Sequence, residues 1–169
     1  MTFKGRFTIL LAAAIATATA HEARAAEAAK PVTVETASYS LSLDGQTGAP
    51  VSLRMFDREF VAPATAPRSL FGIRLRDAKG SPVDLESAKA QKVSIQRTDE
   101  TDQTILTLDY SNLDGKPISA QATVRCRHDK PAMYWRLSIT NGTGMFIDHI
   151  DFPNVILPND LIGSGGTSR

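Results

Sequence analysis

The sequence predicts an all-β protein, an antiparallel β-sandwich, and three observations support this fold class. From Val32 onward the apolar residues recur with a period of two, rather than the 3.6 of a helix. Turn-forming residues interrupt these runs at intervals of roughly 10 residues, which is typical of antiparallel sandwiches and barrels. The chain has no internal repeat of about 20–50 residues, which argues against a solenoid or a propeller.

The first half of the chain supplies four of the expected strands. Asp44–Gly48 is a turn between two alternating runs, which predicts a first hairpin. Residues 56–68 contain Pro63 and Pro67 and are expected to form a loop, and residues 77–82 are expected to form a further turn. The one stretch expected to be helical is Leu85–Ala90. The expected strands in this half are Val32–Val34, Tyr39–Leu43, Val51–Met55 and Leu70–Arg76.

The second half has the cleaner alternation. Ile118–Arg127 places aliphatic residues and Cys126 on one face and polar residues on the other. The next strand repeats this pattern, and we expect its Trp135 to be buried between the sheets. Asn141-Gly142 favours a type I′ turn. The expected strands in this half are Lys92–Arg97, Ile105–Tyr110, Ile118–Arg127, Met133–Thr140 and Phe146–Phe152.

Composition narrows the class of protein further. The 169 residues are 42% hydrophobic and 22% charged, as expected for one ordinary globular domain. A pI of about 7.9 argues against a nucleic-acid partner. The single cysteine excludes an internal disulfide and a cysteine-rich zinc site. Beyond the first 25 residues, no apolar run reaches the roughly 20 residues of a membrane span.

The first 25 residues have the three parts of a secretory signal peptide. Lys4 and Arg6 precede an apolar, alanine-rich stretch, and Ala23-Arg24-Ala25 predicts cleavage after Ala25. An amphipathic N-terminal helix is the alternative, but the apolar stretch has no polar face beyond its threonines. We therefore expect an exported protein, periplasmic or extracellular. Removal of this segment lowers the formal net charge from +1 to −1.

The expected domain organisation follows from these boundaries. Residues 1–25 are the signal peptide, 26–31 a linker, 32–158 the sandwich and 159–169 a tail rich in glycine and serine. Because the last apolar run opens into glycines, either the tail is disordered or the chain is the front portion of a longer reading frame.

The polar residues suggest several sites, each with a simpler structural interpretation. His149 and Asp151 share one strand face, with Asp148 on the other, so they could bind a metal or form a catalytic pair. Two ligands are too few for a zinc centre, and a solvated edge strand is the preferred explanation of these residues. His128 lies beside a turn, where exposure is expected. The sequence therefore predicts no catalytic, cofactor-binding or metal-binding residue, and no cofactor.

Other motifs that could form a functional site also have a simpler structural interpretation. The carboxylate pairs Asp84 with Glu86 and Asp99 with Glu100 are expected in turns or at polar ends, without the convergence that glycoside hydrolysis needs. Tyr39 or Tyr134 could stack on a sugar ring, although tyrosines in alternating strands usually belong to the core. Cys126 is expected to be a buried, inert thiol. Asn141-Gly142-Thr143 is a glycosylation sequon, and Gly163-Ser164-Gly165 matches neither a nucleophile elbow nor a phosphate loop.

The strands also carry a family pattern. The chain resembles the N-terminal galactose-mutarotase-like β-sandwich, or supersandwich, of secreted bacterial glycoside-hydrolase-like proteins. In that family the sandwich precedes a catalytic (β/α)8 barrel. The resemblance covers about Val32 to Leu157, and its most specific part is the last two motifs. Its motifs are Tyr39-x-Leu41-x-Leu43-Asp44, Leu70-Phe71-x-Ile73-x-Leu75-x-Asp77-x2-Gly80, Leu106-x-Leu108-x-Tyr110-x2-Leu113-Asp114-Gly115, Tyr134-Trp135-Arg136-Leu137-x-Ile139-x-Asn141 and Ile147-x2-Ile150-x-Phe152-Pro153.

The resemblance implies a function in carbohydrate metabolism, with the catalytic carboxylates on a barrel outside these 169 residues. The leading hypothesis is therefore an incomplete, noncatalytic sandwich module of an exported glycoside-hydrolase-like protein, with carbohydrate and the C-terminal catalytic domain as its partners. A free-standing carbohydrate-binding or surface interaction module is the first alternative. A small enzyme using His149 and Asp151 is the second.

Overall fold

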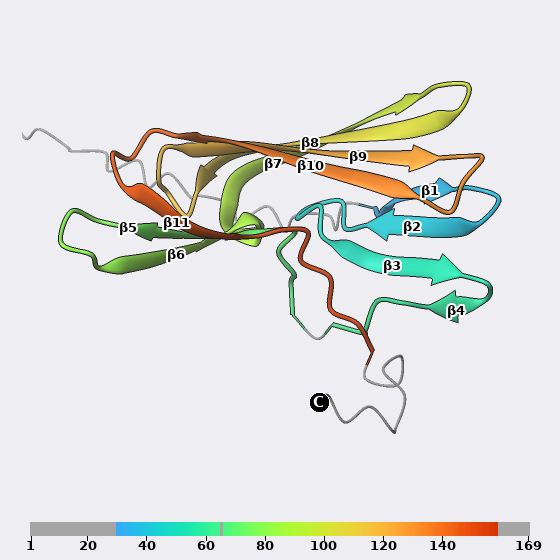
Figure 1. Cartoon of the computed structure of the whole chain (residues 1–169), viewed down its shortest axis with the longest axis horizontal. Helices are drawn as coiled ribbons and strands as arrows, with labels where there is room; N and C mark the ends of the chain where they lie inside the picture. The colour runs from blue at the N-terminus through green and yellow to red at the C-terminus, as the bar shows by residue number, and fades with distance from the viewer. Residues whose placement is uncertain (1–29, 65, 159–169) are drawn as a thin grey trace, which may run out of the picture.

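Three antiparallel sheets in two layers make up the structure (Figure 1). The structure is a computed structural model, and it describes residues 30–64 and 66–158. The sheet of long strands forms one layer, and two shorter sheets lie side by side beneath it. This arrangement confirms the predicted all-β, sandwich-like fold class.

The long sheet has the strand order β10-β9-β8-β7. β8, β9 and β10 alternate between more buried and more exposed side chains because one face lies on the core, and this is the pattern from which they were predicted. β9 has the bounds predicted from the sequence. The strands are β7 (Ala90–Asp99), β8 (Gln103–Leu113), β9 (Ile118–Arg127) and β10 (Met133–Asn141).

The second layer contains two sheets, with the strand orders β1-β2-β3-β4 and β11-β5-β6. The chain crosses between the layers after β10, since β11 pairs with β5 rather than with β10. The strands are β1 (Val32–Glu35), β2 (Tyr39–Leu43), β3 (Pro50–Met55), β4 (Arg58–Glu59), β5 (Gly72–Arg76), β6 (Pro82–Glu86) and β11 (Phe146–Asp151).

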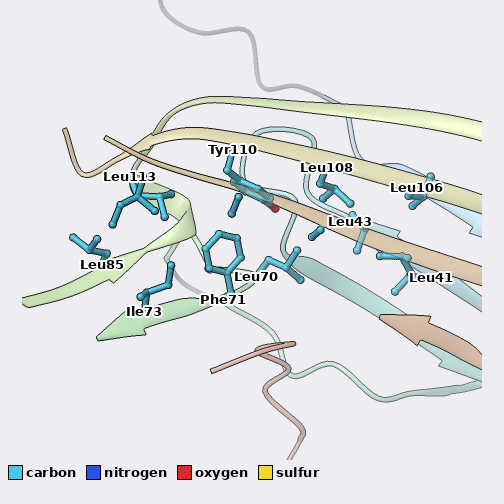
Figure 2. Close-up of a cluster of buried hydrophobic side chains, with 14 of the residues drawn as sticks. Leu41, Leu43, Leu70, Phe71, Ile73, Leu85, Leu106, Leu108, Tyr110 and Leu113 are labelled. Atoms are coloured by element: carbon cyan, nitrogen blue, oxygen red, sulfur yellow. The ribbon is translucent and has the colours of Figure 1, made fainter. Parts of the chain in front are cut away.

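The core lies between the layers and draws on all three sheets (Figure 2). Phe71 and Tyr110 are at its centre, with ring centroids 5.0 Å apart in an edge-to-face arrangement. Both residues are buried, and the Tyr110 hydroxyl donates a hydrogen bond to the Thr47 carbonyl at 3.0 Å. Burial raises the pKa of Tyr110 well above its usual value. This hydrogen bond connects the long sheet to the turn between β2 and β3.

Two local predictions were wrong because pairing overrode local sequence signals. The expected helix Leu85–Ala90 is instead the end of β6, followed by a short 3-10 turn at Ser87–Lys89. Leu85 pairs with Ile73 of β5 and is buried, so burial in the sheet outweighs the helix propensity of a short segment. The expected loop 56–68 contains the short strand β4, whose Glu59 carboxylate accepts hydrogen bonds from the Ser52 hydroxyl and the Leu53 N–H.

The turn after β10 differs from the predicted type I′. Of its residues, Gly144 has a positive φ (73°), whereas Asn141 and Gly142 do not. The Asn141 side chain shapes the turn, since its Oδ1 accepts a hydrogen bond from the Thr143 N–H and its Nδ2 donates to the Met145 carbonyl at 2.8 Å. The sequon asparagine is thus already engaged in the fold.

Trp135 is half-buried, which corrects the prediction that it is enclosed between the sheets. It does point to the inner face, where it lies edge-to-face with Phe152 at 6.1 Å. β10 is the edge strand of the long sheet, so no neighbouring strand among the described residues covers its outer side.

Ser87 is a buried polar residue whose role was not visible in the sequence pattern. Its Oγ accepts hydrogen bonds from the backbone N–H groups of Leu70 (2.7 Å) and Phe71 (3.3 Å). We expect Ser87→Ala to lower the free energy of unfolding by about 2 kcal/mol, because it leaves two buried donors unpaired. Urea unfolding measures this loss. Ser119→Ala, at an exposed site on β9, is the control and should change stability by less than about 0.5 kcal/mol; equal losses would contradict the role of Ser87.

Some predictions fall on residues outside the described ranges. The signal peptide, most of the linker, Gly163-Ser164-Gly165 and the rest of the tail are among them. Within residues 30–64 and 66–158, no helix has the length and apolar character needed to cross a membrane.

Candidate functional site: a polar groove on the three-stranded sheet

An open groove lies over the outer face of the sheet β11-β5-β6, on the side away from the long sheet. It has a volume of about 760 Å³ and is bordered by the segment before β5 and the segment after β11. The groove is lined by Pro63, Ala64, Ala66, Pro67, Arg68, Ser69, Gly72, Ile73, Arg74, Asp84, Leu85, Glu86, His149, Asp151, Asn154 and Ile156.

Strand register arranges the polar side chains of the groove in two rows. β5 buries Ile73 and Leu75, so its alternate residues Gly72 and Arg74 face outward. Gly72 pairs with Asp151 of β11 and with Glu86 of β6. Arg74 likewise pairs with His149 and Asp84. The first row is therefore Asp151–Gly72–Glu86, and the second is His149–Arg74–Asp84.

Gly72 leaves an open place between two carboxylates. Neighbouring strands lie about 4.8 Å apart, so the backbones of Asp151 and Glu86 are roughly 10 Å apart across it. A Cβ atom at Gly72 would be 3.8 Å from Asp151 Oδ2 and 3.9 Å from the Leu85 carbonyl oxygen, which are ordinary contact distances. The space thus accepts a Cβ atom, and glycine leaves it open.

Arg74 is held in the second row by Asp84. Its Nε and Nη2 donate to the two carboxylate oxygens at 2.7 and 3.2 Å. This hydrogen-bonded pair lowers the pKa of Asp84 and raises that of Arg74. A general acid for glycoside hydrolysis needs a raised pKa, so Asp84 has the opposite character.

The predicted pair His149 and Asp151 is present, with Nε2 and Oδ1 2.9 Å apart. Both side chains are well exposed, at 60% and 65%. Nucleophilic catalysis would need a hydroxyl or thiol next to the imidazole. Ser69 is the hydroxyl in the groove lining, and its Oγ accepts the Ala88 N–H at 3.2 Å and lies 3.5 Å from Glu86 Oε2. The hydroxyl is therefore engaged on the β6 side of the groove.

The prediction that Asp148 lies on the face opposite His149 was wrong. The register of β11 shifts between Ile147 and His149, and such a bulge interrupts the alternation of side chains. Asp148 consequently forms an ion pair with the outward-facing Arg76 at 3.0 Å. That hydrogen-bonded contact lowers the pKa of Asp148.

The two carboxylate pairs lie in different parts of the structure. Asp84 and Glu86 were expected in a turn or at a polar end, but they lie on β6, on the same face of the sheet as Asp151. Asp99 and Glu100 lie at the β7–β8 turn, outside the groove, where Asp99 accepts hydrogen bonds from Thr104 and Arg97. Over the described parts of the chain, no three His, Cys, Asp or Glu residues are placed to hold a metal ion.

The remaining candidates lie away from the groove. Tyr39 is buried and donates to the Ala132 carbonyl, so it belongs to the core. Tyr134 is 60% exposed on the outer face of β10. His128 is half-buried rather than exposed, because its Nε2 lies 3.0 Å from the hydroxyl of the buried Thr104. Cys126 is buried as predicted, and burial raises the pKa of its thiol.

Sequence reasoning missed Gly72 and Arg74. The available signal was a glycine on the outward face of a regular strand, since such a glycine often marks a close approach of another molecule. Their partners in β11 could not be found this way, because pairing between strands that are distant in the chain is not visible in local alternation. Their partners in β6 were missed because Pro82 was assigned to a turn and Leu85–Ala90 to a helix.

Comparison with known proteins adds no family assignment. No protein-family model matches the chain, and no curated protein matches it significantly.

Proposed function

We propose that this chain is a noncatalytic β-sandwich module of an exported glycoside-hydrolase-like protein, and that it contacts carbohydrate through the groove on β11-β5-β6. The observation that carries the proposal is the open place at Gly72, between the carboxylates of Asp151 and Glu86 and beside Arg74 and His149. Export rests on the signal-peptide pattern of the first 25 residues, and the family rests on the sequence resemblance.

The chemistry of the groove favours a neutral, hydroxyl-rich ligand. Each sugar hydroxyl both donates and accepts, while carboxylates accept, guanidinium groups donate and an imidazole can do either. The lining has three carboxylates and two guanidinium groups, so its charges nearly balance. A strongly charged polymer would need a field of one sign instead.

The same geometry favours binding over catalysis. Asp84 is ion-paired with Arg74 and its pKa is lowered, and the Ser69 hydroxyl bonds on the β6 side of the groove rather than to His149. We expect no hydrolysis of aryl-glycosides. Measurable turnover that disappears in His149→Ala would overturn the noncatalytic proposal.

Gly72→Val tests the binding site directly. Valine favours strands and the space at Gly72 accepts a Cβ, so we expect unchanged or slightly higher stability. Because its methyl groups fill the space between the carboxylates, binding of neutral oligosaccharides should weaken by about tenfold or more. Isothermal titration with a panel of neutral gluco-, xylo- and galacto-oligosaccharides measures this. Ser119→Val, which adds the same side chain to the outer face of β9, should leave binding unchanged.

A free-standing carbohydrate-binding module is the second candidate, and the exposure of Tyr134 favours it. Tyr134 lies next to Arg125 in the register of β9 and β10, and both border a small hollow of about 180 Å³. An exposed aromatic ring beside polar groups can stack on a sugar. Binding that is lost in Tyr134→Ala and retained in Gly72→Val would select this surface over the groove.

A further inference from the structure

The edge of β10 differs from the other sheet edges that the structure describes. Exposed edges are usually protected by short length, proline, bulges or charged side chains. β1 and β4 are short, β6 starts at Pro82, β11 has a bulge, and β7 carries Lys92 and Arg97. β10 has nine residues, no proline and a regular register with β9, and its one charged residue is Arg136.

The backbone groups free at this edge belong to the odd-numbered residues of β10. At the two ends of the β9–β10 pair, Arg127 N–H bonds to the Ala132 carbonyl and Gly142 N–H bonds to the Pro117 carbonyl. Hydrogen-bonded and non-hydrogen-bonded pairs alternate in an antiparallel ladder. The backbone N–H and C=O groups of the even-numbered residues between Ala132 and Gly142 therefore point toward β9. The N–H and C=O groups of Trp135, Leu137 and Ile139, and of the strand's two end residues, therefore point outward.

The side chains of these same residues line an apolar groove beside the edge. Trp135, Leu137 and Ile139 from β10 meet Ile147 and Ile150 from β11 and Phe152. The groove has a volume of about 400 Å³, and Ile147 and Ile150 are 40% and 41% exposed. The same edge of β10 thus carries both the unpaired backbone groups and the half-buried apolar side chains.

We propose that two copies of this chain pair antiparallel through β10, about a two-fold axis at Leu137, to form one continuous sheet. This proposal is independent of the carbohydrate site. In this register Leu137 pairs with Leu137 of the second copy, Trp135 with Ile139, and Met133 with Asn141. Every outward-facing backbone group of the strand is then satisfied, and the two apolar grooves meet across the axis.

Charge and the length of the paired segment select this register over its neighbours. With the axis at Leu137, each Arg136 lies opposite Ser138 of the second copy, and Tyr134 lies opposite Thr140. Moving the axis to residue 136 would place the two Arg136 side chains directly opposite each other, which is unfavourable. Moving it to Ser138 would leave Met133 outside the paired segment.

Charge substitutions at Ser138 test the pairing without touching the core. Ser138 is exposed on the outer face. A lysine there would lie opposite Arg136 of the other copy, and the two-fold axis repeats this repulsive contact. Ser138→Lys should therefore raise the dimer dissociation constant by about tenfold. Ser138→Glu should lower it, since the same contacts become attractive. The double variant Arg136→Glu/Ser138→Lys should return it to near the original value.

Sedimentation velocity over a concentration series measures the dimer dissociation constant of the original protein and of the three variants. Circular dichroism checks that each protein is folded. Ser119→Lys, with the same charge change on the inner strand β9, is the matched control and should dimerise like the original protein. A monomer at every concentration would overturn the proposal and leave the edge to a strand from another chain. Dissociation constants that are insensitive to the Ser138 variants would also overturn it, as would weakening by Ser138→Glu, which indicates an axis at residue 138.

Discussion

Phe71→Ala is expected to lower the free energy of unfolding by about 3–5 kcal/mol, since it removes a fully buried aromatic side chain and leaves a cavity. Phe71 lies at the centre of the core, where its ring meets that of Tyr110 edge-to-face at 5.0 Å (Figure 2). The total free energy of unfolding of a domain of this size is only about 5–15 kcal/mol, so the variant should be close to unfolding at room temperature.

The control for this substitution is Phe146→Ala. Phe146 is 71% exposed on β11, so the same chemical change should cost less than about 0.5 kcal/mol. Guanidinium unfolding of both variants at one protein concentration measures the difference. Similar losses for the two phenylalanines would contradict the position of the core between the sheets.

Gly48→Ala should also cost about 3–5 kcal/mol, for two separate reasons. Gly48 has a φ of +69°, a conformation that an alanine adopts only with strain. A Cβ atom there would also collide with the Tyr110 hydroxyl and the Leu108 side chain. To avoid the collision, Tyr110 must move away and lose its hydrogen bond to the Thr47 carbonyl.

Gly80→Ala separates these two reasons. Gly80 has a similar φ of +83°, but a Cβ there would have no atom within 4 Å. It should therefore show the backbone strain alone, about 1–2 kcal/mol. Thermal and denaturant unfolding of the two variants should differ by the cost of the collision. If Gly48→Ala is no worse than Gly80→Ala, the close packing of this turn on β8 is wrong.

Local alternation predicted the long strands because one face of each lies on the core. β9 has its predicted bounds, and β10 is one residue longer than predicted. Leu85–Ala90 was misassigned because it is short and rich in helix-forming residues, while the strand conformation of Leu85 and Glu86 depends on pairing with β5. Trp135 was expected to be buried because alternation gives the face of a side chain but not whether another strand covers it.

For the candidate site, the sequence identified His149 and Asp151 as a pair on one strand face, and their side chains do meet at 2.9 Å. It did not place Gly72 between Asp151 and Glu86, since β11 lies far from β5 in the sequence and β6 was not predicted as a strand.

The all-β class, the period of most strands and the burial of Cys126 could be predicted from the amino-acid order alone. These properties depend on the alternation of neighbouring residues, which is a local feature of the chain. Four features became visible in the folded chain alone: the order of strands in each sheet, the bulge that turns Asp148 toward Arg76, the groove, and the open edge of β10. The physical reason is that register between distant strands depends on which faces are buried together, and a shift by one residue would send the groove side chains to the opposite face of the sheet.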